Sequence, residues 1–354
     1  MRDFHHAPAL VIWELTRACD LVCRHCRAST IPERDPQELT TEEGLRLLDQ
    51  IRQFGQVALV LTGGDPLKRP DLFDLLRYAV GQGLRTTLAP SVTPLLSPEV
   101  IRRLKDIGVT RLGISLDGPD ALTHDGFRGM PGSFERTLDV LQLAATIGLE
   151  TQINTTVTRH NFRRLEDIAR RLQPYRPRLW SVFFLVPTGR ARLQDDLSAE
   201  EYEEVFRTLY EISQRVDFQV KTTEAPHYRR YVAQRSRREP RSSAGQWGRS
   251  VLRTLGINDG KGFVFISHTG EIYPSGFLPL SAGNVRTDSL VEVYRDSPLF
   301  RQLRQPDLLE GKCRRCEYRN ICGGSRARAY ALTGNYLASD PRCIYEPVAH
   351  RHAV

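Results

Sequence analysis

The stretch Cys19-Asp20-Leu21-Val22-Cys23-Arg24-His25-Cys26 places three thiols within eight residues, and the rest of the chain is arranged around it. Thiolates are soft ligands that suit iron–sulfur clusters and zinc. Three ligands leave one iron of a four-iron cubane open, and an open iron can bind a small molecule through amino and carboxylate groups. The alternatives are a zinc site with a fourth ligand from elsewhere, and three thiols buried in the core. The segment is polar and rich in arginine, which makes buried core thiols the weakest interpretation.

Length and composition indicate a large protein that folds around its own core. The 354 residues, 40% of them hydrophobic, are enough for one large α/β domain and a smaller one. No apolar run approaches the ~20 residues of a membrane helix, and residues 1–6 are too polar for a signal peptide. We therefore expect a cytoplasmic protein, away from membranes, whose thiols stay reduced. The seven cysteines are odd in number and fall in two tight groups, which favours metal ligation over disulfides.

The charge of the chain is basic. The formal net charge is +8, and only five of the 50 Lys and Arg residues are lysines. A basic balance can indicate nucleic acid, anionic lipid or an acidic substrate as a partner. An excess of arginine can equally reflect the codon usage of a GC-rich genome, so charge alone selects none of these partners.

Strand and helix patterns alternate six times over residues 9–216. The predicted strands are 10–15, 57–61, 84–88, 112–116, 150–157 and 179–186. The predicted helices begin at Thr40, Pro70, Ser97, Ser133, Asn161 and Ser198. Alternation with short loops favours a parallel sheet with helices packed outside. Six units are too few for an ordinary eight-fold barrel, so we predict an α/β fold, a partial (β/α)6 TIM-like barrel.

The remaining chain is divided differently. We assign residues 1–216 to the barrel, 217–262 to a basic helix and linker, and 263–354 to a small C-terminal domain that opens with a hairpin. Ligand sites of parallel sheets lie at the carboxyl ends of the strands. The first cysteine group follows the first predicted strand, so it falls at that end.

Polar or glycine-rich segments follow the second and fourth predicted strands as well. Thr62-Gly63-Gly64-Asp65-Pro66 has two glycines that let a backbone approach a ligand closely. Ser115-Leu116-Asp117-Gly118-Pro119 offers side-chain oxygens for ribose hydroxyls. The structural alternative is that both segments are simply turns.

The fifth and sixth predicted strands give weaker signals. Asn154 and Thr156 alternate with apolar residues, which points them toward the barrel interior unless bonds within the core satisfy them. Val186-Pro187-Thr188-Gly189-Arg190 ends the sixth strand.

The second thiol group is Cys313-x2-Cys316-x5-Cys322, with Cys343 after a gap. Four thiolates can ligate one 4Fe–4S cluster completely, or one zinc ion. Spacing alone leaves this choice open.

The CxxxCxxC spacing of residues 19–26 resembles the signature of the radical SAM family, whose open iron chelates S-adenosylmethionine (SAM). Residues 62–66 look like the family's GGEP motif with Asp65 in place of Glu, and residues 115–118 look like its SLDG segment. The resemblance implies an enzyme that cleaves SAM to a 5′-deoxyadenosyl radical, which abstracts hydrogen from a substrate. It implies a SAM-binding 4Fe–4S cluster on Cys19, Cys23 and Cys26. The SAM contacts that it implies are His25, Gly63, Gly64, Asp65, Pro66, Ser115, Asp117, Asn154 and Val186.

Beside such a core, the second thiol group resembles the auxiliary-cluster domains called SPASM or, when shortened, twitch. A full SPASM domain holds two clusters, but Ser275 stands here where such domains often place a cysteine. We therefore expect one auxiliary 4Fe–4S cluster on Cys313, Cys316, Cys322 and Cys343, with zinc as the alternative. The expected cofactors are two 4Fe–4S clusters and SAM.

Residues 184–190, 225–230 and 313–327 resemble a subgroup related to heme-biosynthesis radical SAM enzymes. This implies a tetrapyrrole substrate whose side chains are modified or decarboxylated, with an external electron donor such as flavodoxin or ferredoxin. The tentative substrate residues are Arg190, His227, Arg229 and Arg230, because arginine pairs with carboxylates in a bidentate fork. The alternative for Arg229 and Arg230 is a solvated helix face.

Two other functions remain open. The first is a radical SAM/SPASM maturase that modifies a ribosomal peptide. The second, more remote, is a metal-bearing nucleic-acid binder that uses the basic stretch 229–241. Nucleic acid is the less favoured partner, because only Tyr228, Tyr231 and Trp247 are near enough to stack on bases.

Overall fold

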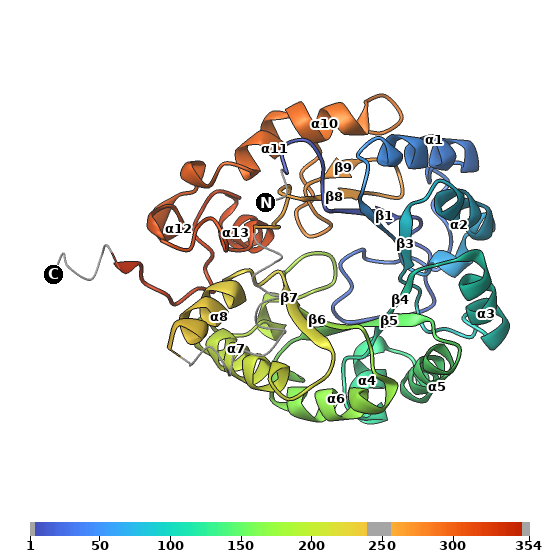
Figure 1. Ribbon diagram of the computed structural model, residues 1–354, viewed down its shortest axis with the longest axis horizontal. Coiled ribbons are helices and arrows are strands. Elements are labelled where there is room, and N and C mark those ends of the chain that lie inside the picture. The colour runs from blue at the N-terminus through green and yellow to red at the C-terminus, as the bar shows by residue number, and fades with distance from the viewer. Residues whose placement is uncertain (1–3, 239–255, 349–354) are drawn as a thin grey trace.

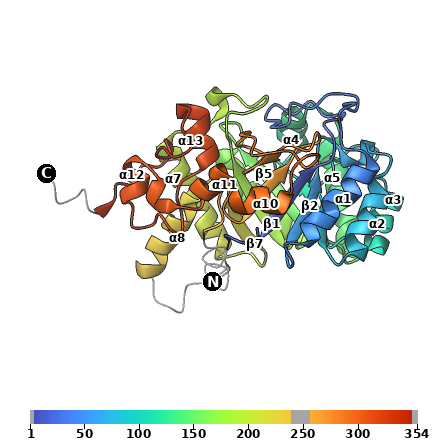
Figure 2. The same ribbon diagram turned by 90° about the horizontal axis from the view of Figure 1, so that it is seen from above.

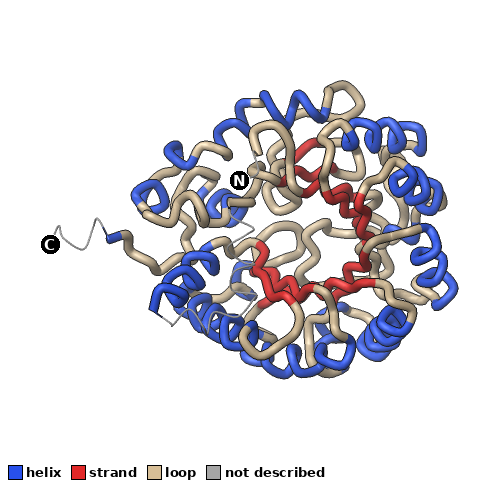
Figure 3. The backbone as a smooth tube through the Cα atoms, in the orientation of Figure 1, coloured by secondary structure: helices blue, strands red, loops and turns tan. Residues whose placement is uncertain are grey.

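The computed structural model describes residues 4–238 and 256–348 and shows a curled sheet with helices on its outer face (Figures 1 and 3). The strand order is β7-β6-β5-β4-β3-β2-β1-β8-β9. The strands are β1 Leu10–Glu14, β2 Ala58–Thr62, β3 Arg85–Leu88, β4 Arg111–Ser115, β5 Glu150–Val157, β6 Leu179–Phe184, β7 Gln219–Thr223, β8 Phe263–Ile266 and β9 Ile272–Tyr273. All neighbours pair in parallel except β8 and β9. The predicted partial barrel is confirmed.

Helices cover the convex side of the sheet. The helices of the barrel are α1 Thr41–Arg52, α2 Leu72–Gly81, α3 Pro98–Ile107, α4 Ala121–Arg128, α5 Ser133–Thr146, α6 Leu165–Leu172, α7 Ala199–Ser213 and α8 His227–Arg238. The later helices are α10 Leu290–Asp296, α11 Pro298–Leu303, α12 Gly311–Arg315 and α13 Arg326–Thr333. In Figures 1 and 2 the segment with α12 and α13 lies beside α8, where the curled sheet remains open. In the described ranges, no helix combines the length and the apolar character needed to cross a membrane.

The sheet extends beyond the six predicted strands. β7 begins after residue 216, and β8 pairs with β1, so one sheet runs across the predicted limits of the barrel. β7 has the sequence Gln-Val-Lys-Thr-Thr, whose single apolar residue gives little strand signal. The predicted hairpin is present as β8 and β9. The domain limits stay a prediction, and residues 239–255 of the predicted linker lie outside the described residues.

Local signals fixed several helix starts correctly and others wrongly. The capping boxes of Thr40 and Ser198 are both formed, and each bonds to the glutamate three residues on. Pro70 does not open α2, which starts at Leu72. Asn161 caps no helix, because its side-chain amide donates to the carbonyls of Asp117 and Thr156. The short helix α4 was not predicted.

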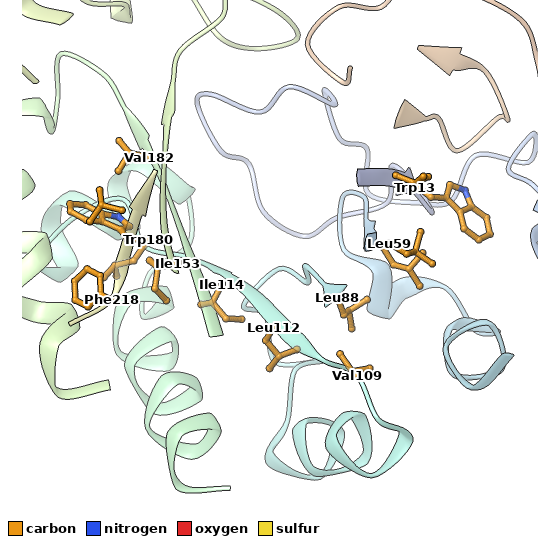
Figure 4. Close-up of a cluster of buried hydrophobic side chains, with 14 of the residues drawn as sticks. Trp13, Leu59, Leu88, Val109, Leu112, Ile114, Ile153, Trp180, Val182 and Phe218 are labelled. Carbon is orange, nitrogen blue, oxygen red and sulfur yellow. The ribbon is translucent and has the colours of Figure 1, made fainter. Parts of the chain in front are cut away.

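The core lies between the sheet and the outer helices (Figure 4). Trp180 of β6 is completely buried, and its indole N–H donates to the hydroxyl of Thr155 over 2.8 Å. The same hydroxyl donates to the carbonyl of Leu116 over 2.6 Å. Thr155 therefore satisfies two polar groups that have no access to water.

We expect Thr155→Val to lower the free energy of unfolding by about 1–3 kcal/mol, because it leaves the Trp180 N–H and the Leu116 carbonyl unpaired. Urea denaturation followed by tryptophan fluorescence measures the change. Thr208→Val is the matched control, since the Thr208 hydroxyl is exposed and bonds only the carbonyl of Glu204 in its own helix. Equal effects of the two substitutions would contradict the role given to Thr155.

Candidate functional site

The first cysteine loop follows β1 directly and brings its three thiols together. Cys19 and Cys23 are buried with Leu21, and Cys26 and Met130 pack against them. Burial raises the pKa of the Cys19 and Cys23 thiols. Thiols whose pKa is raised in this way stay protonated at neutral pH. A metal that binds at this loop must therefore displace their protons.

A backbone clamp holds this loop against the segment after β2. The N–H of Gly64 donates to the carbonyl of Thr16 over 2.8 Å, and the N–H of Asp65 donates to that of Ala18 over 2.6 Å. A Cβ on Gly63 would lie 2.5 Å from the Thr16 oxygen, and one on Gly64 would overlap the Ala18 oxygen. The two glycines were predicted to admit a ligand. The close neighbour in the structure is the chain's own cysteine loop.

Asp65 and Pro66 shape the segment that carries the clamp. The Asp65 carboxylate is fully buried and accepts from the N–H of Leu67 and the hydroxyl of Thr93. Pro66 begins a single 3₁₀ turn behind it. Burial raises the pKa of Asp65. Both oxygens are used within the fold, so Asp65 supports the loop.

A cavity of about 150 Å³ lies at the carboxyl ends of β2 to β5, beside the cysteine loop. Its wall includes four of the predicted SAM contacts, Gly63, Gly64, Ser115 and Asn154. It also includes five polar residues that were not predicted as site residues, Ser91, His124, Arg128, Ser133 and Thr137. Ser91 follows β3, so the strand-end rule offered a signal for it. His124 and Arg128 lie on α4 and gave no comparable signal.

Arg128 links this cavity to a buried carboxylate. Its Nη2 atom lies 2.5 Å from the Asp117 carboxylate, and its Nη1 atom lies 3.7 Å from the Cys23 sulfur. Burial alone would raise the pKa of Asp117, but the charge of Arg128, together with His25, His124 and the Thr156 N–H, outweighs it and the pKa is lowered. Asp117 also accepts from the Thr156 N–H over 2.7 Å. The structure thus places Asp117 behind Arg128 and outside the residues that line the cavity.

The other two predicted SAM contacts, His25 and Val186, pack against neighbouring side chains. The His25 ring lies flat on Phe127, with ring centroids 4.3 Å apart, and burial lowers its pKa to about 4. His25 is thus a neutral ring that packs on Phe127. Val186 packs with Leu278, Leu303 and Ala327 in a small cluster, and it does not line the cavity.

The second cysteine group closes around one small cavity of about 20 Å³. All four of its cysteines line this cavity, together with His227 and Arg230 of α8. Burial raises the pKa of Cys343 to about 11. Ser275, which stands where a cysteine was considered, lies just after β9 and is buried. Its hydroxyl accepts a hydrogen bond from the N–H of Phe277. The described residues therefore form one second thiol site with four sulfurs.

The second thiol group supplies four sulfurs to one place in the fold. Four thiolates can ligate one 4Fe–4S cluster completely, or one zinc ion. Among the described residues, no three His, Cys, Asp or Glu side chains are grouped closely enough to hold a single metal ion.

The tentative substrate residues lie at two separate places. Arg190 holds the first cysteine loop in place, because its guanidinium donates hydrogen bonds to the carbonyls of Cys23 and Thr30. His227 and Arg230 face the second thiol site instead. Arg230 is buried and paired with Glu203, so the solvated-face alternative is wrong for it. These side chains do not form one carboxylate fork.

The basic helix α8 is occupied by contacts within the chain. Arg235 lies over the ring of Tyr231 at 5.5 Å, and Arg237 lies over that of Tyr318 at 5.8 Å. This part of the proposed nucleic-acid surface is therefore engaged in the fold. The rest of it, residues 239–241, lies outside the described residues.

The structure combines a curled parallel sheet with a thiol loop after its first strand and a four-thiol site at its opening. These features together define an iron–sulfur enzyme built on a partial barrel. The pattern of the radical SAM superfamily matches residues 13–172, and that of the SPASM iron–sulfur cluster-binding domain matches residues 258–317. The chain belongs to the radical SAM superfamily. It is an enzyme whose cofactors are SAM and 4Fe–4S clusters.

Individual relatives extend this similarity over the whole chain. AdoMet-dependent heme synthase of Methanosarcina barkeri is 42% identical over 342 residues, which is 97% of this chain and 98% of the relative. The heme synthase of Oleidesulfovibrio alaskensis is 42% identical over 350 residues, 98% of this chain and 90% of the relative. Streptococcus suis SuiB bound to S-adenosylmethionine shares the fold, with a TM-score of 0.74 at 17% identity over 96% of this chain and 78% of SuiB.

We expect Gly64→Ala to displace the cysteine loop, because its Cβ would overlap the Ala18 carbonyl and lie 2.7 Å from that of Arg17. Iron content after anaerobic reconstitution should fall by about half, with loss of the first cluster only. Gly81→Ala is the control, since nothing lies within 4 Å of its Cβ position. Full iron content in the Gly64 variant would show that the clamp is dispensable.

Proposed function

We propose that this enzyme modifies propionate side chains of an iron-bound tetrapyrrole by oxidative decarboxylation. The observation that supports this substrate is 42% identity to AdoMet-dependent heme synthase over nearly the full length of both chains. The likeness to SuiB, also solved with its precursor peptide, is 17% identical and concerns the fold alone. A peptide is therefore kept as an outcome of the test.

We further propose that Cys19, Cys23 and Cys26 hold the SAM-binding cluster and that the 150 Å³ cavity beside them receives SAM. When bound, this cluster and SAM supply a 5′-deoxyadenosyl radical that removes one hydrogen atom from the substrate. The chain's own task is to position these groups. Arg128 presents its positive charge beside Cys23 and is itself held by Asp117. Ser115 and Asn154 offer hydrogen bonds from adjacent strands.

Cys313, Cys316, Cys322 and Cys343 are proposed to hold one auxiliary 4Fe–4S cluster. Their cavity lies beside α8, which follows the edge strand β7, so this cluster would face the opening of the barrel. All seven cysteines are free thiols, which suits a reducing cytoplasm. An external carrier such as flavodoxin or ferredoxin is proposed as the electron donor.

The number of clusters can be counted. We expect about eight irons per chain after anaerobic reconstitution, since each 4Fe–4S cluster contributes four. Replacing Cys19, Cys23 and Cys26 by serine should leave about four irons and abolish SAM cleavage. Replacing Cys313, Cys316, Cys322 and Cys343 should leave the four irons of the SAM-binding cluster. Zinc in place of iron in the first variant would refute the auxiliary cluster.

The substrate can be identified by the 5′-deoxyadenosine it releases. We expect iron-coproporphyrin to stimulate SAM cleavage and to lose carbon dioxide, while peptides with cleavable leader sequences do neither. Mass spectrometry of the porphyrin product measures a loss of 46 mass units per propionate converted to vinyl, about one carbon dioxide and two hydrogens. Stimulation by a peptide and not by the porphyrin would replace the tetrapyrrole with a peptide substrate.

A further inference from the structure

The imidazole ring of His227, at the start of α8, has no hydrogen-bond partner. The side chain is buried, and within the described ranges neither of its ring nitrogens makes a hydrogen bond. A histidine ring carries at least one N–H, whichever nitrogen holds the proton. A buried N–H without an acceptor is unfavourable, and such groups in folded proteins are nearly always paired. The ring of His227 therefore lacks an acceptor that its surroundings are expected to supply.

The ring of His227 is held in one orientation. It lies nearly parallel to the ring of Tyr202, with the centroids 5.5 Å apart and an angle of 13° between the planes. The ring of Phe206 meets it edge-on, with the centroids 4.8 Å apart. Both aromatic side chains are completely buried in the main core. Turning the imidazole toward a partner elsewhere would displace close-packed side chains.

The carboxylate of Asp340 lies near this ring but is not its acceptor. Its Oδ2 atom is 3.6 Å from Nδ1 of His227, which is too far for a hydrogen bond. The same oxygen accepts from the N–H of Ser325 over 2.8 Å and lies 3.4 Å from Nη1 of Arg328. These two donors hold Asp340 in place, so the acceptor for His227 must come from another side.

That other side is the second thiol site. His227 lines the cavity of about 20 Å³ that the four C-terminal cysteines enclose, and Asp340 and Tyr202 do not line it. Two N–H groups already approach sulfurs at this site. The N–H of Gly324 lies 3.4 Å from the Cys322 sulfur, and Nη2 of Arg326 lies 3.9 Å from the Cys313 sulfur. Sulfur is thus the acceptor that this cavity offers to a nearby donor.

The position at the cavity distinguishes His227 from other buried atoms without a partner. The indole nitrogen of Trp13 is also unpaired, but Trp13 lines neither of the two cavities. Arg230 and Arg319 line the thiol cavity and have an unpaired Nε atom. Each of them is paired with a carboxylate through another nitrogen, whereas both nitrogens of His227 remain unpaired.

We propose that the His227 ring donates a hydrogen bond to a sulfur of the auxiliary cluster and thereby raises the reduction potential of that cluster. This rests on the proposed function, in which Cys313, Cys316, Cys322 and Cys343 hold a 4Fe–4S cluster. Hydrogen bonds to the sulfurs are among the features that set cluster potentials. An N–H fixed beside the cluster stabilises the additional negative charge of the reduced form. His227 acts through the cluster, so it is a positioning residue.

The assignment also gives each polar residue in the first turn of α8 a place beside the second thiol site. Arg229 donates to the carbonyl of Ile321, the residue before Cys322, over 3.1 Å. Arg230 lines the thiol cavity and pairs with Glu203. The three residues of this turn that were expected to bind substrate are thus engaged by the chain around the auxiliary site.

The test measures the potential of the auxiliary cluster alone. In the full chain with Cys19, Cys23 and Cys26 replaced by serine, only this cluster remains after anaerobic reconstitution, and a redox titration followed by electron paramagnetic resonance gives its potential. We expect His227→Phe to lower the equilibrium constant for reduction about tenfold, which is about 59 mV for one electron. His227→Gln restores an N–H donor and should keep the parent potential. His160→Phe is the control, because His160 is exposed and contacts Asp195.

An unchanged potential in His227→Phe would overturn the hydrogen bond. So would an equal fall in His227→Phe and His227→Gln, since a change in packing would then explain both. Zinc in place of iron in the parent would refute the auxiliary cluster itself, and this proposal with it. The iron content therefore separates failure of the proposed function from failure of the inference.

A second measurement detects the bond directly and does not require the His227→Phe variant to take up iron. With histidine ring nitrogens labelled with ¹⁵N, pulsed electron paramagnetic resonance of the reduced cluster in the parent should show a coupled ¹⁵N nucleus. The coupling should persist in His160→Phe and, where the cluster forms, disappear in His227→Phe. Absence of ¹⁵N coupling in the parent would overturn the proposal.

Discussion

Two backbone hydrogen bonds between Thr16–Ala18 and Gly64–Asp65 fix the first cysteine loop to the sheet. They continue the pairing of β1 with β2 past the ends of both strands, where a loop would otherwise leave its polar groups to water. Only glycine permits so close an approach at residue 64, because any side chain would overlap the Ala18 carbonyl. The positions of the thiols of Cys19, Cys23 and Cys26 are therefore set by the attachment of the loop to the rigid sheet, and not by the loop itself.

Charge is balanced locally around the two thiol sites. At the first, Arg128 sits between Cys23 and the buried Asp117. At the second, Asp340 is completely buried and holds Arg328 at 3.4 Å, while His227 lies 3.6 Å from the same carboxylate. A cation also lies near sulfur at each site: Arg128 beside Cys23 at the first, and Arg326, whose Nη2 atom lies 3.9 Å from the Cys313 sulfur, at the second. These arrangements fit sites that exchange electrons, because a fixed dipole environment needs little rearrangement when charge moves.

The sequence predicted the barrel and both thiol groups because these depend on local patterns. Six strands, two capping boxes and all seven cysteines follow from periodicity and spacing alone. The unpredicted parts depend on tertiary contacts. β7 is recognised as a strand only through its pairing with β6, and the partners of Arg190 and Arg230 come from segments 160 and 27 residues away. The sequence thus identifies side chains with the right chemistry, but it does not show which hydrogen bonds and ion pairs those side chains make within the fold.

The position of β1 in the middle of the sheet has a consequence for biosynthesis. β1 is synthesised well before its second neighbour, β8, which begins only at Phe263. Until then one edge of β1 remains unpaired, and unpaired edges are where nascent chains pair with other molecules. The loop that carries Cys19 also lacks the contact of Arg27 with the Gly276 carbonyl during this interval. The first thiol loop therefore acquires its full set of contacts only after the chain has been synthesised as far as Gly276.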